Sequence, residues 1–219
     1  APVSDEIFVR RIYLDVVGRI PTIKETTDFL ADKAEDKRAK LIDALLASDG
    51  YAQNFFNYWA DILRLRSQLA VGNSQPAGAA YNNWLRKALA DNVPYDKMVR
   101  EMVTANGKTY ENGAVGFYLR DYNMPLDNMA VTTQIFLGTS MVCAQCHNHP
   151  FDRWTMNDYY GFAAFFAQIG RKAGEDPRET IVFNNVNYVA EAAPYPNYSG
   201  DQKLQYVVLR SLDRARAPA

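Results

Sequence analysis

The sequence predicts a mainly α-helical fold with a small β-containing segment at its C-terminal end. Up to about residue 170, apolar residues recur at the three- and four-residue spacing of amphipathic helices. Beyond that point, short β-branched and aromatic runs alternate with Asn, Pro and Gly. The chain has 219 residues and is 48% apolar, which is enough for one sizeable core or two small ones. We therefore expect a helical domain over residues 1–175 and a small β-containing extension over 176–219.

Helix start and stop signals define the first four helices. Ser4 precedes two acidic residues and an apolar stripe that ends at Gly18, a typical helix terminator. Thr22 and Glu25 have the spacing of a capping box, which predicts the start of a second helix. Helical spacing continues over 36–47 and, in a pattern rich in aromatic residues, over 51–66.

Turn-forming residues separate the elements of the middle of the chain. Gly, Asn, Ser and Pro are frequent over 70–79, which we expect to be a loop. Two helices follow over 81–90 and 95–105, and Pro94 separates them. The stretch 109–123 has no clear period, so we expect it to be irregular.

Two more helices are predicted before the composition changes. Pro125, at a plausible first helical position, predicts a helix to about Leu137. Thr155 and Asp158 resemble a second cap, which predicts an aromatic helix that reaches Ile169. The chain then enters the part that carries the β signals.

The C-terminal part contains three β-like runs. We expect the charged stretch 171–178 to be a loop. The runs 179–183 and 186–189 flank Asn184-Asn185, which is typical of a hairpin. A third β-like run spans 204–209.

Both cysteines of the chain, and one of its two histidines, stand together at Cys143, Cys146 and His147. The pattern C-x-x-C-H is the attachment sequence of c-type haem. Two thiols at this spacing can each form a thioether to one vinyl group of a porphyrin, and the adjacent histidine can ligate the iron. We therefore predict one covalent haem c, with His147 as the proximal iron ligand. The expected fold class is then a multi-helix c-type haem domain with a β appendage.

Three other uses of these cysteines are open. With His147 and His149 they could bind zinc, but all four ligands would lie within seven residues, whereas a tetrahedral site usually closes a longer loop. A thioredoxin-like redox pair needs a strand before Cys143, and none is predicted there. A disulfide between Cys143 and Cys146 would be inert.

The second axial ligand of the iron is also open. Met124 and Met129 are reachable on chain length, and a methionine ligand would favour electron transfer. His149 lies two residues after the proximal ligand and is poorly placed for the opposite face of the same haem. No methionine follows Met156, which excludes the downstream methionine of small c-type cytochromes. A five-coordinate iron is the remaining alternative.

Composition narrows the possible partners. The net charge of −1 provides no basic field for nucleic acid. No run of about 18 apolar residues predicts a transmembrane helix. The first residues carry no hydrophobic leader, which would suit a mature or truncated product. A redox partner protein, a homo-oligomer or a larger multi-haem assembly would each fit these properties.

Several segments resemble the cytochrome-c-like domain of secreted proteins from planctomycetes and related bacteria. The resemblance covers roughly residues 5–175, and its motifs are specific. They include C-A-Q-C-H-N-H-P-F-D-R-W at 143–154 and the segments 8–22, 36–48, 136–138, 158–161 and 163–166. The resemblance implies haem c, a shared role for His149 and a periplasmic or extracellular location. It implies no particular reaction.

On these grounds we expect an exported c-type cytochrome that transfers electrons. An open iron site would instead make the protein a haem enzyme or a ligand sensor. A third possibility is a structural or assembly module stapled by haem. The sequence favours an electron carrier over a stand-alone enzyme, and no catalytic residue is predicted.

Overall fold

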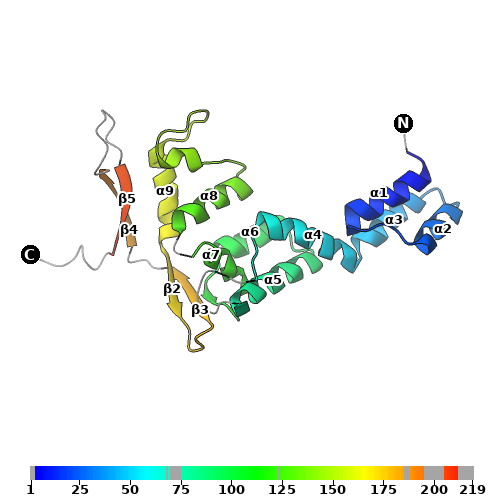
Figure 1. The fold of residues 1–219 in the computed structure, drawn as a ribbon, viewed down its shortest axis with the longest axis horizontal. Coiled ribbons are helices and arrows are strands. Elements are labelled where there is room, and N and C mark those ends of the chain that lie inside the picture. The colour runs from blue at the N-terminus through cyan, green and yellow to red at the C-terminus, as the bar shows by residue number, and fades with distance from the viewer. Residues whose placement is uncertain are drawn as a thin grey trace, which may run out of the picture. The chain divides into compact units, whose positions relative to one another are not determined.

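The computed structural model describes residues 3–67, 69, 75–122, 124–184, 188–194 and 205–211. The described chain is mainly helical with small antiparallel sheets, which confirms the predicted fold class (Figure 1). Contacts divide the chain into two compact units. The first comprises residues 1–62 and 85–94, and the second comprises 63–84 and 95–219. Among the described residues, no helix is both long and apolar enough to cross a membrane.

The first unit is built from four short helices and the end of a fifth. The four helices are α1 (Asp5–Val17), α2 (Ile23–Ala31), α3 (Lys37–Leu46) and α4 (Asp49–Ile62). Their shared core contains four buried side chains from three helices, namely Val9, Tyr13, Phe29 and Leu45. Val9 and Tyr13 are four residues apart on α1, so the amphipathic spacing of the sequence indicates which face of this helix joins the core.

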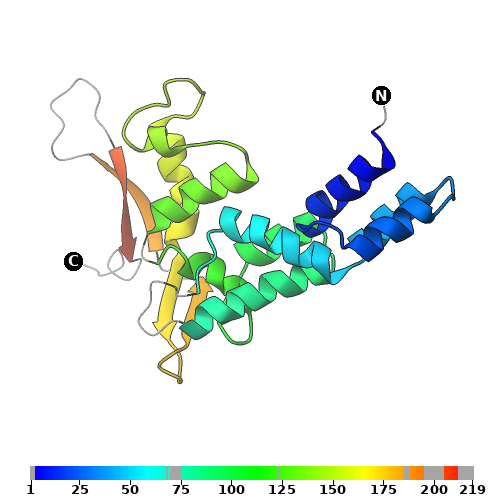
Figure 2. The ribbon, with the colours of Figure 1, turned by 45° about the vertical axis from the view of Figure 1, so that its right-hand side comes forward.

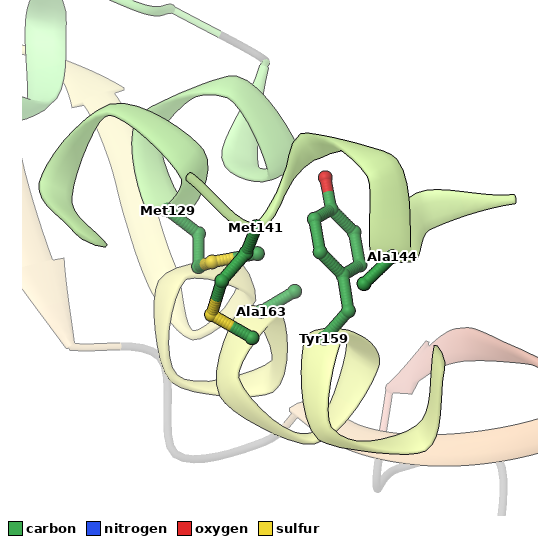
Figure 3. Packing of buried hydrophobic residues seen from close by; sticks show 5 residues of the cluster. All are labelled: Met129, Met141, Ala144, Tyr159 and Ala163. Carbon is green, nitrogen blue, oxygen red and sulfur yellow. The ribbon is translucent and has the colours of Figure 1, made fainter. Parts of the chain in front are cut away.

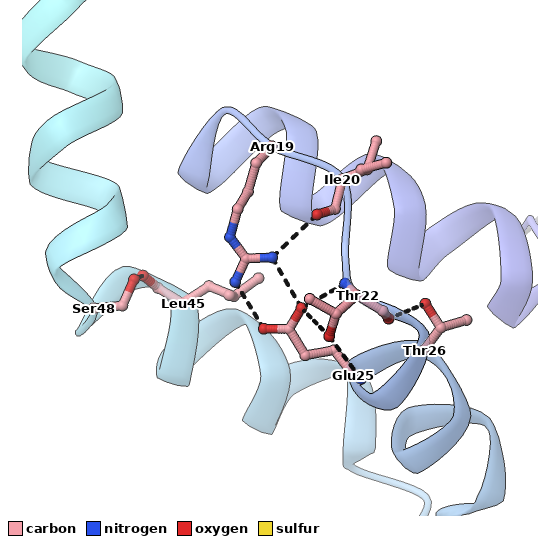
Figure 4. A network of polar contacts seen from close by, with 7 residues as sticks. All are labelled: Arg19, Ile20, Thr22, Glu25, Thr26, Leu45 and Ser48. Carbon is pink, nitrogen blue, oxygen red and sulfur yellow. Dashed lines mark hydrogen bonds and ion pairs between the residues drawn. The ribbon is translucent and has the colours of Figure 1, made fainter.

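The predicted caps of the first unit are present. Gly18 ends α1 in the left-handed conformation (φ 71°), and its N–H donates to Leu14 O at 3.2 Å. A Cβ at this position would lie 2.5 Å from Asn54 Oδ1, so the position favours glycine for two independent reasons. The capping box of Thr22 and Glu25 starts α2 (Figure 4). Helix α4 ends at Ile62, before the predicted end at residue 66.

The second unit contains the remaining helices of the described chain. They are α5 (Gln75–Ala90, whose residues 85–90 belong to the first unit), α6 (Tyr95–Val103), α7 (Gly116–Leu119), α8 (Pro125–Phe136) and α9 (Met156–Ala167). Two 3₁₀ turns accompany them, η1 (Gly113–Val115) and η2 (Val142–Gln145). Helix α9 contacts both α8 and η2, and this places the turn η2 against the helical core.

Two predictions for the middle of the chain are wrong in part. Helix α5 begins at Gln75, inside the predicted loop 70–79, and residues 70–74 lie outside the described chain. A Cβ at Gly78 would collide with the Ser67 carbonyl, so the small residues that suggested a loop instead allow close packing of a helix. The predicted irregular stretch 109–123 contains η1 and α7.

The C-terminal strands pair differently from the prediction. The strands are β1 (Gly107–Lys108), β2 (Ile169–Ala173), β3 (Thr180–Asn184), β4 (Tyr188–Pro194) and β5 (Gln205–Ser211). The first three form an antiparallel sheet in the order β1-β3-β2. Strand β2 lies beside β3, and β4 lies beside β5 (Figure 1, Figure 2). The predicted hairpin between 179–183 and 186–189 is therefore wrong, and its tip at Asn185 lies outside the described residues.

The charged stretch 171–178, predicted as a loop, begins as the strand β2. This strand lies at the edge of its sheet, where charged side chains are tolerated because one side is open to solvent. Its register pairs Ile169 with Asn184 and Ala173 with Thr180. The predicted domain boundary between residues 175 and 176 stays a prediction, although this β2–β3 ladder spans it.

Candidate cofactor site

The C-x-x-C-H segment forms a single turn between α8 and α9. Cys143 lies within η2, and Cys146 is its C-terminal cap. Because a 3₁₀ helix has three residues per turn, residues three apart lie on the same side. Both thiols are free and exposed, while Ala144 between them is fully buried. The turn therefore presents its two sulfur atoms to solvent and its alanine to the core.

A methionine- and tyrosine-lined core holds this turn in place. Ala144 packs in a cluster with Met129 of α8, Met141, and Tyr159 and Ala163 of α9 (Figure 3). Burial raises the pKa of Tyr159 to about 12, so its phenol is neutral at physiological pH. The turn is thus supported from below by an apolar cluster whose tyrosine is neutral.

A second contact joins the turn to α9 through its backbone. The Tyr160 hydroxyl donates to the Gln145 carbonyl oxygen at 3.1 Å. Gln145 is the last residue of η2, so this bond supports the turn directly before Cys146.

His147 is exposed, and its ring has a defined proton arrangement. Its Nδ1 lies 2.6 Å from the carbonyl oxygen of Asn148. A carbonyl oxygen can only accept a hydrogen bond, so Nδ1 carries the proton and Nε2 of the neutral ring does not. Nε2 is therefore the ring nitrogen with a free lone pair, which is the form that a metal requires.

His149 has the opposite arrangement. Its Nδ1 accepts a hydrogen bond from the Phe151 N–H at 3.2 Å, so the proton of the neutral ring is on Nε2. Its backbone N–H donates to Trp154 O at 2.8 Å. In this conformation His149 closes the turn over residues 149–154 and offers no bare ring nitrogen outward.

The structure places the two candidate methionines in different surroundings. Met129 is fully buried within the cluster beneath Ala144. Met124 is 51% exposed and directly precedes α8. The structure identifies neither methionine as a ligand, so the choice among Met124, Met129 and His149 stays a prediction.

The other interpretations of the cysteines find less support in this geometry. Among the described residues, which include all four candidate zinc ligands, no group of three or more His, Cys, Asp or Glu side chains converges as a metal site. Cys143 and Cys146 form no disulfide. Cys143 follows α8 and sits in a 3₁₀ turn, so it lacks the strand-to-helix setting of a thioredoxin-like pair.

The residues fit a covalently attached porphyrin. Two exposed thiols lie on one side of a turn, next to a histidine whose Nε2 has a free lone pair. Apolar side chains beside the motif are also exposed, with Val142 at 52% and Phe151 at 94%. Such exposed apolar surface suits contact with an apolar group.

The segment 143–154 contains one arginine and no lysine. Arg153 is exposed and lies over the Trp154 ring at 4.9 Å. Arg120 is buried elsewhere in the second unit, where it pairs with Asp121 at 2.8 Å. Arg171 donates to the Tyr118 carbonyl oxygen at 3.0 Å. Arg153 is thus the exposed basic residue of the motif loop that could pair with a haem propionate.

A separate cavity of about 590 Å³ lies at the C-terminal ends of α8 and α9. Aromatic side chains line it, among them Tyr118, Phe136 and Phe166. Cys143, Cys146 and His147 are not among its lining residues, so the cavity is not part of the candidate site.

Comparison with known families gives one match. PSCyt2, a family of proteins of unknown function (DUF1549), matches residues 1–171. The chain belongs to the PSCyt2 family. The matched range contains all nine α-helices of the described chain and the complete C-x-x-C-H turn. No curated protein and no solved structure matches the chain. The name PSCyt2 points to a cytochrome-like domain, but the family description assigns no function.

Sequence reasoning missed two residues that shape this site. Ala144 is an unremarkable residue in the sequence, and only the packing of α8 and α9 reveals that it anchors the turn. Asn148 was not singled out, although its side-chain oxygen accepts from the Met156 N–H at 3.1 Å. The predicted start of a helix near Met156 could have indicated this role, because the N–H groups of the first helical turn need acceptors from outside the helix.

Proposed function

We propose that this PSCyt2 domain carries one covalent haem c and serves in electron transfer. Cys143 and Cys146 form the two thioethers, and His147 ligates the iron through Nε2. One observation carries the proposal: two free, exposed thiols lie on one side of a turn beside a histidine whose Nδ1 is already hydrogen-bonded. Haem supplies one-electron redox chemistry when bound.

On the protein side, attachment needs two free thiols. Each thiol adds across one vinyl C=C bond, with sulfur bonding to one carbon and hydrogen to the other. The addition is redox-neutral, and it requires free thiols; Cys143 and Cys146 are not joined in a disulfide. Because covalent attachment of haem c takes place outside the cytoplasm, we also propose a periplasmic or extracellular location, with a protein as redox partner.

Intact-mass measurement tests the proposal most directly. The chain is expressed together with a haem c attachment system and exported. We expect a mass increase equal to one haem that survives denaturation, together with a c-type absorption spectrum. Replacing both cysteines (Cys143→Ser, Cys146→Ser) should abolish the increase. An unchanged mass in the parent chain would overturn the proposal.

A second function, a haem enzyme or ligand sensor with an open iron site, has its own support. Met129 is fully buried beneath the motif, and Nδ1 of His149 is occupied by the Phe151 N–H. Neither is poised as a second axial ligand in this conformation. A high-spin ferric spectrum with rapid cyanide binding would favour this function, whereas a low-spin six-coordinate spectrum would favour electron transfer.

A further inference from the structure

We propose that Asn148 is a positioning residue that fixes the orientation and the protonated nitrogen of His147 by tying it to the N-terminus of α9. The inference rests on the proposed role of His147 as the iron ligand. It adds a residue that the attachment motif itself does not include. Asn148 would act through His147 and would touch neither substrate nor iron.

Two contacts of Asn148 carry the argument, one from its backbone and one from its side chain. Its carbonyl oxygen accepts from His147 Nδ1 at 2.6 Å. Its side-chain Oδ1 accepts from the Met156 N–H at 3.1 Å. Met156 is the first residue of α9, so its N–H has no partner within the helix. One residue thus joins the imidazole to a rigid element.

Helix α9 is a suitable anchor because its start is fixed in other ways. Thr155 Oγ1 accepts from the Asp158 N–H at 3.1 Å, and Asp158 Oδ2 accepts from the Thr155 N–H at 2.9 Å. Tyr159 and Ala163, further along the helix, are buried against Ala144. The same helix therefore supports the cysteine turn from below and the histidine from the side.

The tether matters because a hydrogen bond to Nδ1 determines the properties of Nε2. It places the ring proton on Nδ1, holds the ring plane and raises the basicity of the ligating nitrogen. Without the side-chain bond to Met156, the Asn148 carbonyl would still exist but would no longer be held at one position. His149 cannot replace His147 as the iron ligand in this conformation. Its Nδ1 accepts from the Phe151 N–H, so its ring proton lies on Nε2.

Three substitutions separate positioning from simple helix capping. Asn148→Leu removes the acceptor while keeping a side chain of similar size. Asn148→Asp keeps an acceptor oxygen, and its negative charge is favourable at a helix N-terminus. Thr155→Val is the matched control, because it removes another acceptor from the same helical turn and has no contact with His147.

The first readout needs no haem. In the full chain with Cys143→Ser and Cys146→Ser, nitrogen NMR reports which ring nitrogen of each histidine carries the proton. We expect His147 to carry it on Nδ1 and His149 on Nε2. The Asn148→Leu variant should lose the His147 preference, while Asn148→Asp and Thr155→Val should keep it. A parent chain with the His147 proton on Nε2 would overturn the inference, whether or not any variant folds.

The second readout is the midpoint potential of the haem-loaded chain. A less basic ligand binds ferric iron less well, so Asn148→Leu should raise the potential. A 10-fold loss of ferric preference, at the lower end of outer-shell effects, corresponds to about 59 mV for one electron. If Asn148→Leu and Thr155→Val change neither readout or change both equally, Asn148 is only a cap and the inference is wrong. If no haem attaches to the parent, the proposed function fails, and the NMR result still decides the role of Asn148.

Discussion

At the scale of single residues, the candidate site depends on what separates its two cysteines. Ala144 is fully buried against Met129, Met141, Tyr159 and Ala163. A methyl group fills this space, and a larger side chain would have to displace the turn. The x-x of C-x-x-C is therefore not a neutral spacer here, because one of its residues sets the direction of both thiols.

Ala144→Leu should accordingly destabilise the fold and hinder attachment. Overpacking a filled core typically costs about 1–3 kcal/mol. We expect a loss of this size in the free energy of unfolding measured with urea, together with a lower yield of haem-bearing chain. Gln145→Leu is the matched control, since it adds leucine at a partly exposed neighbour and keeps the carbonyl that Tyr160 binds. Equal stability losses in the two variants would contradict the packing argument.

At the scale of elements, features set by neighbouring residues could be predicted from the sequence, whereas features set by long-range packing could not. The caps at Thr22 and Thr155 were predicted because each lies within four residues of its partner. The pairing of β2 with β3 was missed, because the charged residues Arg171 and Lys172 are typical of a loop. Charged residues are also tolerated in an edge strand, but only the tertiary structure shows that β2 is one. The start of α5 was missed because a glycine such as Gly78 usually indicates a loop. Here it instead allows the helix to approach the Ser67 carbonyl closely, and the sequence does not show this contact.

The start of α2 gives a prediction about pH. Hydrogen bonds from Arg19, at 2.7 and 2.9 Å, together with weaker contributions from Thr22, lower the pKa of Glu25 to about 2 (Figure 4). A carboxylate with a depressed pKa stabilises the fold at pH values above its pKa in the unfolded chain, which is near 4.5. This stabilisation is lost as the pH falls towards 2, the pKa in the folded protein. Because the pair is partly exposed, we expect less than about 1 kcal/mol from it.

Carbon NMR of the Glu25 carboxyl group, followed from pH 6 downward, measures this directly. Arg19→Gln should move the Glu25 titration upward towards the value of an ordinary glutamate. Lys24→Gln is the control, because Lys24 pairs with Asp28 on the same helix and not with Glu25. A Glu25 titration that Arg19→Gln leaves in place would exclude the ion pair as its main cause.

The start of α9 gives a prediction about stability. Thr155 supplies the N-cap oxygen of the helix that supports the cysteine turn. Its replacement by alanine should cost about 1 kcal/mol in the free energy of unfolding. Thr155→Ser, which keeps the acceptor oxygen, should recover most of the loss. Circular dichroism during urea unfolding provides the measurement, and an unaffected Thr155→Ala variant would show that the other contacts of α9 suffice.

At the scale of the whole molecule, two compact units share one chain while the candidate site belongs to only one. The first unit has its own core around Val9, Tyr13, Phe29 and Leu45. The motif, α8 and α9 all lie in the second unit. A sequence pattern of amphipathic helices cannot reveal this division, since it shows that apolar faces exist but not which of them share a core. The fold class and the motif were accessible from sequence, whereas the assignment of helices to cores required contacts.

This division predicts that haem attachment stabilises the molecule unevenly. A covalent haem stays on the chain when it unfolds, but its packing and iron ligation form only in the folded second unit. These contacts therefore stabilise that unit and have no direct effect on the first. Hydrogen exchange of the loaded chain, compared with the Cys143→Ser, Cys146→Ser chain, should therefore slow by more than about tenfold in α8 and α9. Exchange in α1, α2 and α3 should be nearly unchanged. Equal slowing throughout would mean that the two units unfold together. Unchanged exchange in α8 and α9 of a haem-bearing chain would mean that the haem does not stabilise these helices.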